Sequence, residues 1–153
     1  MLMKAATLKA GRSGSPVTSG GGSSIGATYN SWLDAERIVE RGLPFRAIQR
    51  LASVSGLTFE QIKRAARLSA ATFARRRQSG VLLPEESERV LRLSRLFERA
   101  VDLFQNDRDG ARQWLTMSIP ALADRSPLDL ARTEVGAREV EDLIGRIQHG
   151  VIS

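Results

Sequence analysis

The chain has 153 residues and a mass of 16.8 kDa, enough for one compact core or two small ones and too little for a large enzyme fold. Its 23 Lys and Arg against 17 Asp and Glu give a net charge of +6, so a polyanion is the first partner to consider and an acidic protein surface the second. There is no cysteine for disulfides or thiolate metal sites, and no apolar run near the length that spans a bilayer. We therefore expect a cytoplasmic protein, and the low aromatic content of 5% with abundant Ala, Leu and Arg predicts an all-α fold.

The N-terminal part of the sequence predicts a leader followed by two helices. Residues 1–29 are rich in Gly, Ser and Thr and cannot bury enough surface to offset ordering entropy, so we expect a flexible leader. A helix is predicted from Ser31 to Arg41, ended by Gly42. Pro44 begins a second helix, whose apolar residues repeat at helical spacing up to Gly56.

The stretch from Thr58 to Arg77 predicts a helix-turn-helix. Thr58 and Gln61 form a capping box at the start of a first helix, and Ser69 is suited to cap a second helix that ends in three arginines. In such motifs the second helix lies in the major groove of DNA with its N-terminal residues at base edges. A helical hairpin with a solvated arginine face remains the alternative. The candidate DNA-binding residues are Ser69, Ala70, Thr72, Arg75, Arg76 and Arg77.

Three positions depart from the usual pattern of this motif. Arg67 stands at the turn where Gly is usual, at a cost of roughly 1 kcal/mol if that residue must be left-handed. Lys63 and Arg76 replace small or apolar packing residues. Either their stems lie along the surface with the charges in water, or the two helices cross at a different angle.

A long helix is predicted from Pro84, with acids in its first turn where the helix dipole favours them. Its apolar stripe is wider than a single packing face requires. Two explanations remain open: both faces lie in one core, or part of the stripe is a homodimer contact. The candidate dimerisation residues are Val90, Leu93, Phe97 and Phe104.

The C-terminal third predicts three short or amphipathic helices. Residues 106–110 break the long helix, and a short helix covers Ala111 to Leu115. Ser126 caps another short helix. The last helix runs from Gly136 to His149, after which Gly150 is a plausible left-handed cap. The apolar residues beyond it either fold back on their own domain or enter a groove on a partner.

The sequence offers no constellation for catalysis. His149 is the only histidine, so neither a catalytic triad nor a transition-metal cluster can be assembled. No phosphate-cradling Gly loop follows a strand, and neighbouring acids such as Glu141 and Asp142 point different ways on a helix. We expect no enzyme, no cofactor and no metal. Because positive charge is concentrated in the first half, the sequence favours one module for nucleic acid and one for another partner.

Two C-terminal segments, Arg125 to Leu130 and Thr133 to Val151, resemble the toxin-binding domain of the Xre/MbcA/ParS antitoxin family. The segment from Leu83 to Arg89 also looks like these antitoxins, and the similarity covers about residue 34 to the end. Ala123 and Asp124 depart from the family, which usually has glycines there, and this departure is expected to matter little.

The resemblance implies an antitoxin of a type II toxin–antitoxin system. Such antitoxins pair with RES-type toxins that destroy NAD, or with related toxins that transfer ADP-ribose. They typically dimerise, cover the toxin's active site with the C-terminal domain and repress their own operon. We therefore expect a cognate RES-domain toxin and operator DNA as partners, with a homodimer inside a hetero-oligomeric complex. A stand-alone dimeric transcription regulator is the alternative.

On this interpretation the chain divides into a leader (1–29), a helix-turn-helix domain (30–82), a connecting or dimerisation helix (83–106) and a toxin-binding domain (107–153). A charged ridge with an apolar tip suits a cationic pocket that binds NAD. The candidate toxin-binding residues are Glu134, Arg138, Glu139, Asp142, Arg146, His149, Gly150, Val151 and Ile152.

Overall fold

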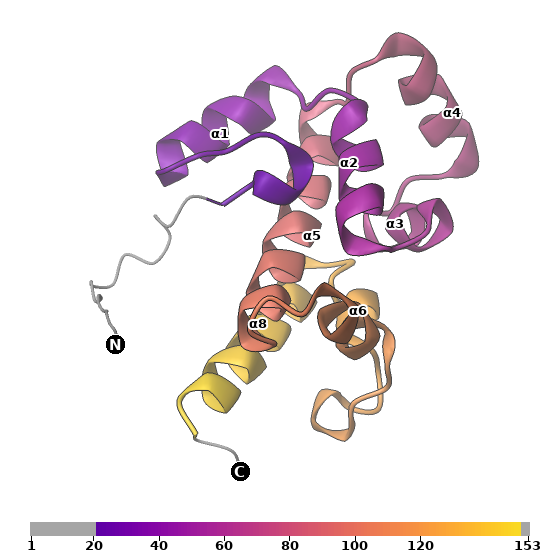
Figure 1. Cartoon of the computed structure of the whole chain (residues 1–153). Helices are drawn as coiled ribbons and strands as arrows, with labels where there is room; N and C mark the ends of the chain where they lie inside the picture. Colours follow the sequence, from indigo (N-terminus) through magenta and orange to yellow (C-terminus); the bar gives the residue numbers. More distant parts are fainter. Residues whose placement is uncertain (1–20, 151–153) are drawn as a thin grey trace.

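A computed structural model describes residues 21–150, which fold as a bundle of helices (Figure 1). Over these residues the only β-structure is isolated bridges, which confirms the predicted all-α fold. None of the described helices is long and apolar enough to cross a membrane. The elements are η3 (Ser23–Ile25), α1 (Trp32–Arg41), α2 (Arg46–Ser55), α3 (Phe59–Ala65), α4 (Ala70–Ser79), α5 (Pro84–Leu103), α6 (Arg108–Thr116), η4 (Pro120–Leu122), α7 (Pro127–Leu130) and α8 (Glu134–Gln148).

The first helices begin and end close to their predicted positions. The Ser31 side chain accepts a hydrogen bond from the Asp34 amide at the start of α1, and Gly42 ends that helix with a φ of 92°. Helix α2 begins at Arg46, two residues after Pro44. The predicted capping box of Thr58 and Gln61 is present at α3, with both of its hydrogen bonds formed.

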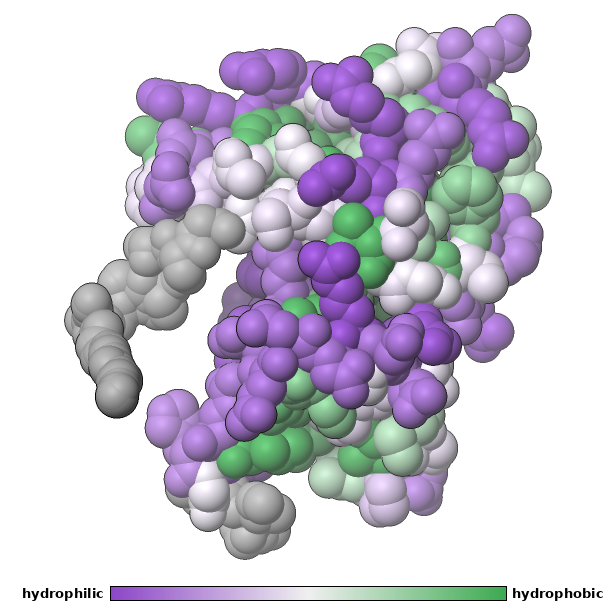
Figure 2. All heavy atoms as spheres, viewed as in Figure 1, coloured by the Kyte–Doolittle hydropathy of each residue, from purple (hydrophilic) through white to green (hydrophobic). Residues whose placement is uncertain are grey.

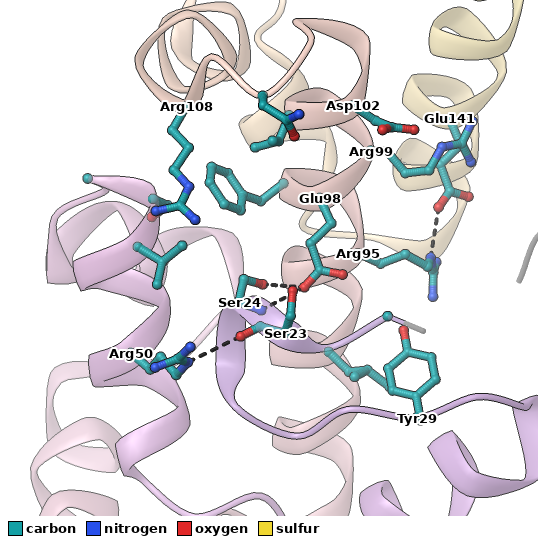
Figure 3. A pocket seen from close by; sticks show the side chains of 18 of the residues that line it. Ser23, Ser24, Tyr29, Arg50, Arg95, Glu98, Arg99, Asp102, Arg108 and Glu141 are labelled. Carbon is teal, nitrogen blue, oxygen red and sulfur yellow. Dashed lines mark hydrogen bonds and ion pairs between the residues drawn. The ribbon is translucent and has the colours of Figure 1, made fainter. Parts of the chain in front are cut away.

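Residues 21–29 were predicted as the end of a flexible leader, and this prediction is wrong for them. Ile25 is buried in the core, where η3 contacts α2. The amides of Gly22 and Ser24 donate to the Glu98 carboxylate at 3.0 and 2.9 Å, and the Ser24 hydroxyl donates to it as well (Figure 3). Glycine made this segment look unstructured, yet the φ of 90° at Gly22 is what lets these donors converge on one carboxylate. Residues 1–20 of the predicted leader lie outside the described residues.

Helix α5 is the central element, because it contacts η3, α1, α2, α6 and α8. Figure 1 shows it running between the helix-turn-helix and the C-terminal helices. Val90, Leu93 and Phe97 are at most 2% exposed, so they lie inside a single protomer. Phe104 is half-buried and its ring packs beside Trp114, with the centroids 6.3 Å apart. Neighbouring helices of the same chain cover Val90, Leu93 and Phe97, so the prediction of a dimer contact is wrong for these three residues. A contact through Phe104 stays a prediction.

Helix α7 begins at Pro127 behind its predicted cap Ser126. Two other C-terminal helices begin earlier than predicted, because polar side chains cap them. Asp107 caps α6, which starts at Arg108 inside the segment predicted as a break. Thr133 caps α8, which therefore starts at Glu134 rather than at Gly136. The inner face of α8 packs on α5 through Val140 and Ile144, both fully buried.

Candidate functional site

The turn between α3 and α4 is a Schellman motif with Arg67 at its left-handed position. The amide of Leu68 donates to the Lys63 carbonyl at 2.8 Å, and the amide of Arg67 donates to the Arg64 carbonyl at 3.2 Å. Arg67 has a φ of 57°, a left-handed backbone conformation that is strained for a residue with a Cβ. The motif usually has Gly at this position. The Arg89 Nε of α5 donates to the Ala66 carbonyl at 2.6 Å and so ties this turn to α5.

Helix α4 exposes a row of polar side chains at a spacing of three residues. The Ser69 hydroxyl accepts from the Thr72 amide at 3.1 Å and donates to the Thr72 hydroxyl at 3.0 Å. Arg75 donates to the same hydroxyl at 3.4 Å. Ser69, Ala70 and Arg75 are exposed and Thr72 is partly exposed, so these residues share one accessible face at the N-terminal end of α4. Their assignment as a DNA-reading surface stays a prediction.

The other two arginines of α4 point elsewhere. Arg76 forms a bidentate ion pair with Glu86 of α5, at 2.7 and 3.1 Å, and its side chain is only 13% exposed. The Arg77 guanidinium lies over the rings of Phe45, Phe59 and Phe73, 5.3 to 5.7 Å from their centroids. The assignment of Arg76 as a DNA contact is therefore not supported by the geometry. Arg77 remains exposed beside the rings, and its assignment stays a prediction.

Lys63, the other charged residue at a position where the motif usually has an apolar side chain, is also engaged by the protein itself. Its ammonium pairs with Glu60 at 2.6 Å and lies 5.2 Å from the centroid of the Phe73 ring, while its stem is mostly covered. The stem therefore runs along the apolar surface, as one of the two predicted explanations required.

Helix α8 carries the predicted partner-binding residues on one exposed face. Glu134, Arg138, Glu139, Asp142 and His149 are exposed, and Arg146 is partly so. Ion pairs link Arg138 to Glu134 at 3.2 Å and Arg146 to Glu139 at 3.8 Å. We call these six residues the α8 ridge. Gly150 follows it with a φ of 71°, while Val151 and Ile152 lie outside the described residues.

Val135 belongs to the same exposed face and was missed at the sequence level. Its side chain is 81% exposed, the highest value among the large apolar residues of the described chain. The signal was available, because Val135 is in phase with Arg138, Asp142 and Arg146 at helical spacing. An apolar side chain at the first turn thus adds to a ridge that is otherwise charged.

Two arginines of α5 hold α8 in place, and neither was predicted. Arg92 is only 7% exposed and donates to the carbonyls of Ala131 and Arg132 at 3.1 and 3.2 Å. It also forms an ion pair with Glu134 at 3.7 Å. Burial lowers the pKa of Arg92 despite the charge of Glu134. Arg95 pairs with Glu141 at 2.8 Å (Figure 3); burial opposes its charge, but this pair raises the pKa of Arg95.

The open groove in Figure 3 lies between the N-terminal segment, α2, α5 and the start of α6. Charges of both signs line it, including Arg50, Glu98, Asp102 and Arg108. In the part of the chain that the structure describes, no three His, Cys, Asp or Glu side chains gather as a metal site would require. The face seen in Figure 2 is largely hydrophilic, with smaller apolar patches, which suits binding through charge rather than through a deep apolar pocket.

Two family models match consecutive regions of the chain. Residues 34–95 match the family model of the antitoxin Xre-like helix-turn-helix domain, and residues 99–150 match that of the antitoxin Xre/MbcA/ParS C-terminal toxin-binding domain. An "Antitoxin Xre" of Photorhabdus laumondii is 35% identical over 84% of this chain and 88% of its own length. An "Antitoxin Xre" of Yersinia enterocolitica is 51% identical, but over only 52% of this chain and 53% of its own length.

Proposed function

Because the chain belongs to the Xre antitoxin family, we propose that it is the antitoxin of a type II toxin–antitoxin system and neutralises an NAD-consuming RES-type toxin. Its C-terminal domain covers the toxin's active site, and its helix-turn-helix represses its own operon. The chain itself is not an enzyme in this role and acts in the cytoplasm.

One observation supports the toxin-binding half most directly. The region that matches the toxin-binding domain presents the α8 ridge to solvent, while the opposite face of α8 is buried against α5. The exposed ion pairs of the ridge, Arg138 with Glu134 and Arg146 with Glu139, contribute little in water and can exchange partners at low cost. The ridge is therefore the surface with which we expect α8 to meet a cationic pocket that binds NAD.

Co-purification tests the partner directly. The tagged chain is isolated from its own cells, and any bound protein is separated by denaturation, refolded and assayed for NAD consumption. We expect the partner to consume NAD only after separation. Transfer of ADP-ribose to a protein, instead of its release as a free product, would identify a transferase toxin. Isolation of the chain without a partner, in a form that shifts its own promoter, would favour the stand-alone regulator.

Charge reversal on the ridge tests the surface. Asp142→Arg should weaken toxin binding at least about tenfold, because it places a like charge against a cationic pocket. Glu40→Arg is the matched control, since Glu40 is an exposed acid on α1, away from the ridge. Equal inhibition of the toxin by wild type and Asp142→Arg would exclude the ridge as the binding surface.

The DNA-binding half is supported by the polar row Ser69, Thr72 and Arg75 at the exposed start of α4. Arg75→Ala should cost about 1–3 kcal/mol if the guanidinium reads a base, or reduce the salt slope by about 1 if it neutralises a phosphate. Gel shifts with the chain's own promoter at several salt concentrations separate these cases. Arg132→Ala removes the same charge from an exposed site near α8 and should leave DNA affinity unchanged.

A further inference from the structure

Helix α4 is anchored to the rest of the protein by few side chains. Of its ten residues only Phe73 is buried, and its ring packs against those of Phe45 and Phe59 with centroids 5.1 and 5.4 Å apart. A single apolar anchor fixes the distance of a helix from its neighbours but leaves rotation about that anchor poorly restrained. A second anchor is needed to decide which side chains of α4 face outward.

The Arg77 guanidinium lies over the same aromatic rings as Phe73 and so adds little that is new in direction. The ion pair of Arg76 and Glu86 supplies the second anchor, because it joins α4 to α5. Arg76 lies three residues after Phe73, and both guanidinium-to-carboxylate bonds are short, at 2.7 and 3.1 Å. The two side chains are 13% and 7% exposed, and the fork geometry of the pair fixes direction as well as distance. Glu86 is itself oriented, because it accepts a bond from the Leu83 amide at 2.9 Å at the start of α5.

The charge of Glu86 is retained in this position. Burial alone would raise the pKa of Glu86, but the bonds from Arg76 and from the Leu83 amide, with the charges of Arg76 and Arg89, bring it below its usual value. An ionised acid close to a recognition helix repels DNA, so simple electrostatics gives no reason for a glutamate here. Its contacts give one, since they fix the orientation of α4.

We propose that Glu86 is a positioning residue for DNA binding: through Arg76 it sets the rotation of α4, so that Ser69, Thr72 and Arg75 face the groove. Arg76 then acts through Glu86 and does not itself touch DNA. This inference rests on the DNA-binding function proposed above.

A matched pair of variants tests the proposal. Glu85→Gln and Glu86→Gln each remove one negative charge from adjacent positions of α5, but Glu85 is exposed and Glu86 is buried in the pair. On charge alone both variants should bind the chain's own promoter fragment slightly more tightly. We expect Glu86→Gln to bind about tenfold or more weakly with an unchanged salt slope, and Glu85→Gln to bind as well as wild type or better.

A second variant guards against simple loss of folding. Arg76→Lys keeps the positive charge but cannot form the bidentate pair. We expect it to remain helical by circular dichroism and to bind the promoter more weakly, again with an unchanged salt slope. If Arg76 touched phosphate as a charge, Lys would substitute for it, so wild-type affinity in Arg76→Lys would overturn the proposal.

The failures can be told apart. A wild-type chain that does not shift its promoter overturns the DNA-binding function, and this inference falls with it. A wild-type chain that binds, together with a Glu86→Gln variant that binds equally well, overturns only the positioning role.

Discussion

Several residues other than glycine occupy the left-handed region of the backbone. Arg67, Ala123 and Asp124 have φ values of 57°, 57° and 60°. The prediction that the residues at 123 and 124 matter little is not supported by this geometry at Ala123, because an L-residue in this region costs about 1–2 kcal/mol, whereas Asp is one of the few residue types that adopts it readily. All three side chains are exposed, so little packing offsets that cost.

Arg67→Gly should therefore stabilise the protein. Relief of about 1–2 kcal/mol of strain is partly cancelled by the greater entropy of glycine in the unfolded chain, about 0.5–1 kcal/mol, which leaves a net gain of about 0.5–1 kcal/mol. Urea unfolding measures this change in the free energy of unfolding. Gly80→Ala is the reverse control: Gly80 has a φ of 85° and nothing lies within 4 Å of an added Cβ, so only backbone strain should destabilise it. No change in either variant would mean that left-handed strain is negligible in this fold.

Glu86 predicts a pH dependence of stability. Because its pKa is lowered in the folded state, its ionisation stabilises the protein above the ordinary glutamate pKa of about 4.3 and stops doing so as pH falls through the folded value. Glu86→Gln should thus be less stable than wild type at pH 7, and the difference should shrink below about pH 4. Urea midpoints across this range test the sign. A stability difference of constant size down to pH 2 would contradict it. Glu85→Gln loses only the interaction of its charge with the helix dipole, so it should differ from wild type by less at pH 7.

At the scale of the element, the two glycines of α8 have opposite requirements. A Cβ on Gly136 would lie 2.2 Å from the Leu130 carbonyl oxygen, where the α7–α8 corner closes. A Cβ on Gly145 would meet nothing within 4 Å. The sequence shows both simply as glycines in a helix, and only the packing of the corner distinguishes them.

Alanine at each position should move stability in opposite directions. Gly145→Ala should raise the free energy of unfolding by about 0.5–1 kcal/mol through helix propensity. Gly136→Ala should lower it, because backbone must shift to relieve the clash. Thermal melts of the two variants provide the comparison, and a stabilised Gly136→Ala would show that the corner is looser than the structure describes.

Some helix caps were predictable from the sequence, whereas contacts between elements were not. Thr58, Ser69 and Ser126 indicate helix starts because a cap involves residues only three apart. Arg92 binds carbonyls 39 and 40 residues away, and no local pattern encodes that distance. The same limit explains the α4 arginines: their number suggested DNA contacts, but the pairing of Arg76 with Glu86 is decided by tertiary structure.

At the scale of the whole molecule, the uneven charge along the chain suggested two modules, but the described residues share one core. Buried residues of α2, such as Leu51, and of α8, such as Ile144, belong to the same hydrophobic cluster, which α5 connects. Arg92 and Arg95 add polar contacts from α5 to the C-terminal elements. Both proposed binding surfaces are therefore attached to one helix, and neither half has a core of its own.

A shared core predicts cooperative unfolding. The amides of Leu51 and Ile144 should exchange hydrogen with the same opening free energy, and Leu96→Ala should lower both values together by about 2–5 kcal/mol, since Leu96 is fully buried on α5. Leu33→Ala, at a surface site that is 40% exposed, should change both by about 0.5 kcal/mol or less. If Ile144 opened at a lower free energy than Leu51, or if Leu96→Ala affected only one of them, the toxin-binding and DNA-binding halves would be separate folding units. Equal responses would instead mean that a substitution in α5 can weaken both functions through stability alone. Weaker promoter binding therefore identifies a residue that positions α4 only in a variant that remains folded by circular dichroism, and the salt slope then shows whether a phosphate contact was lost as well.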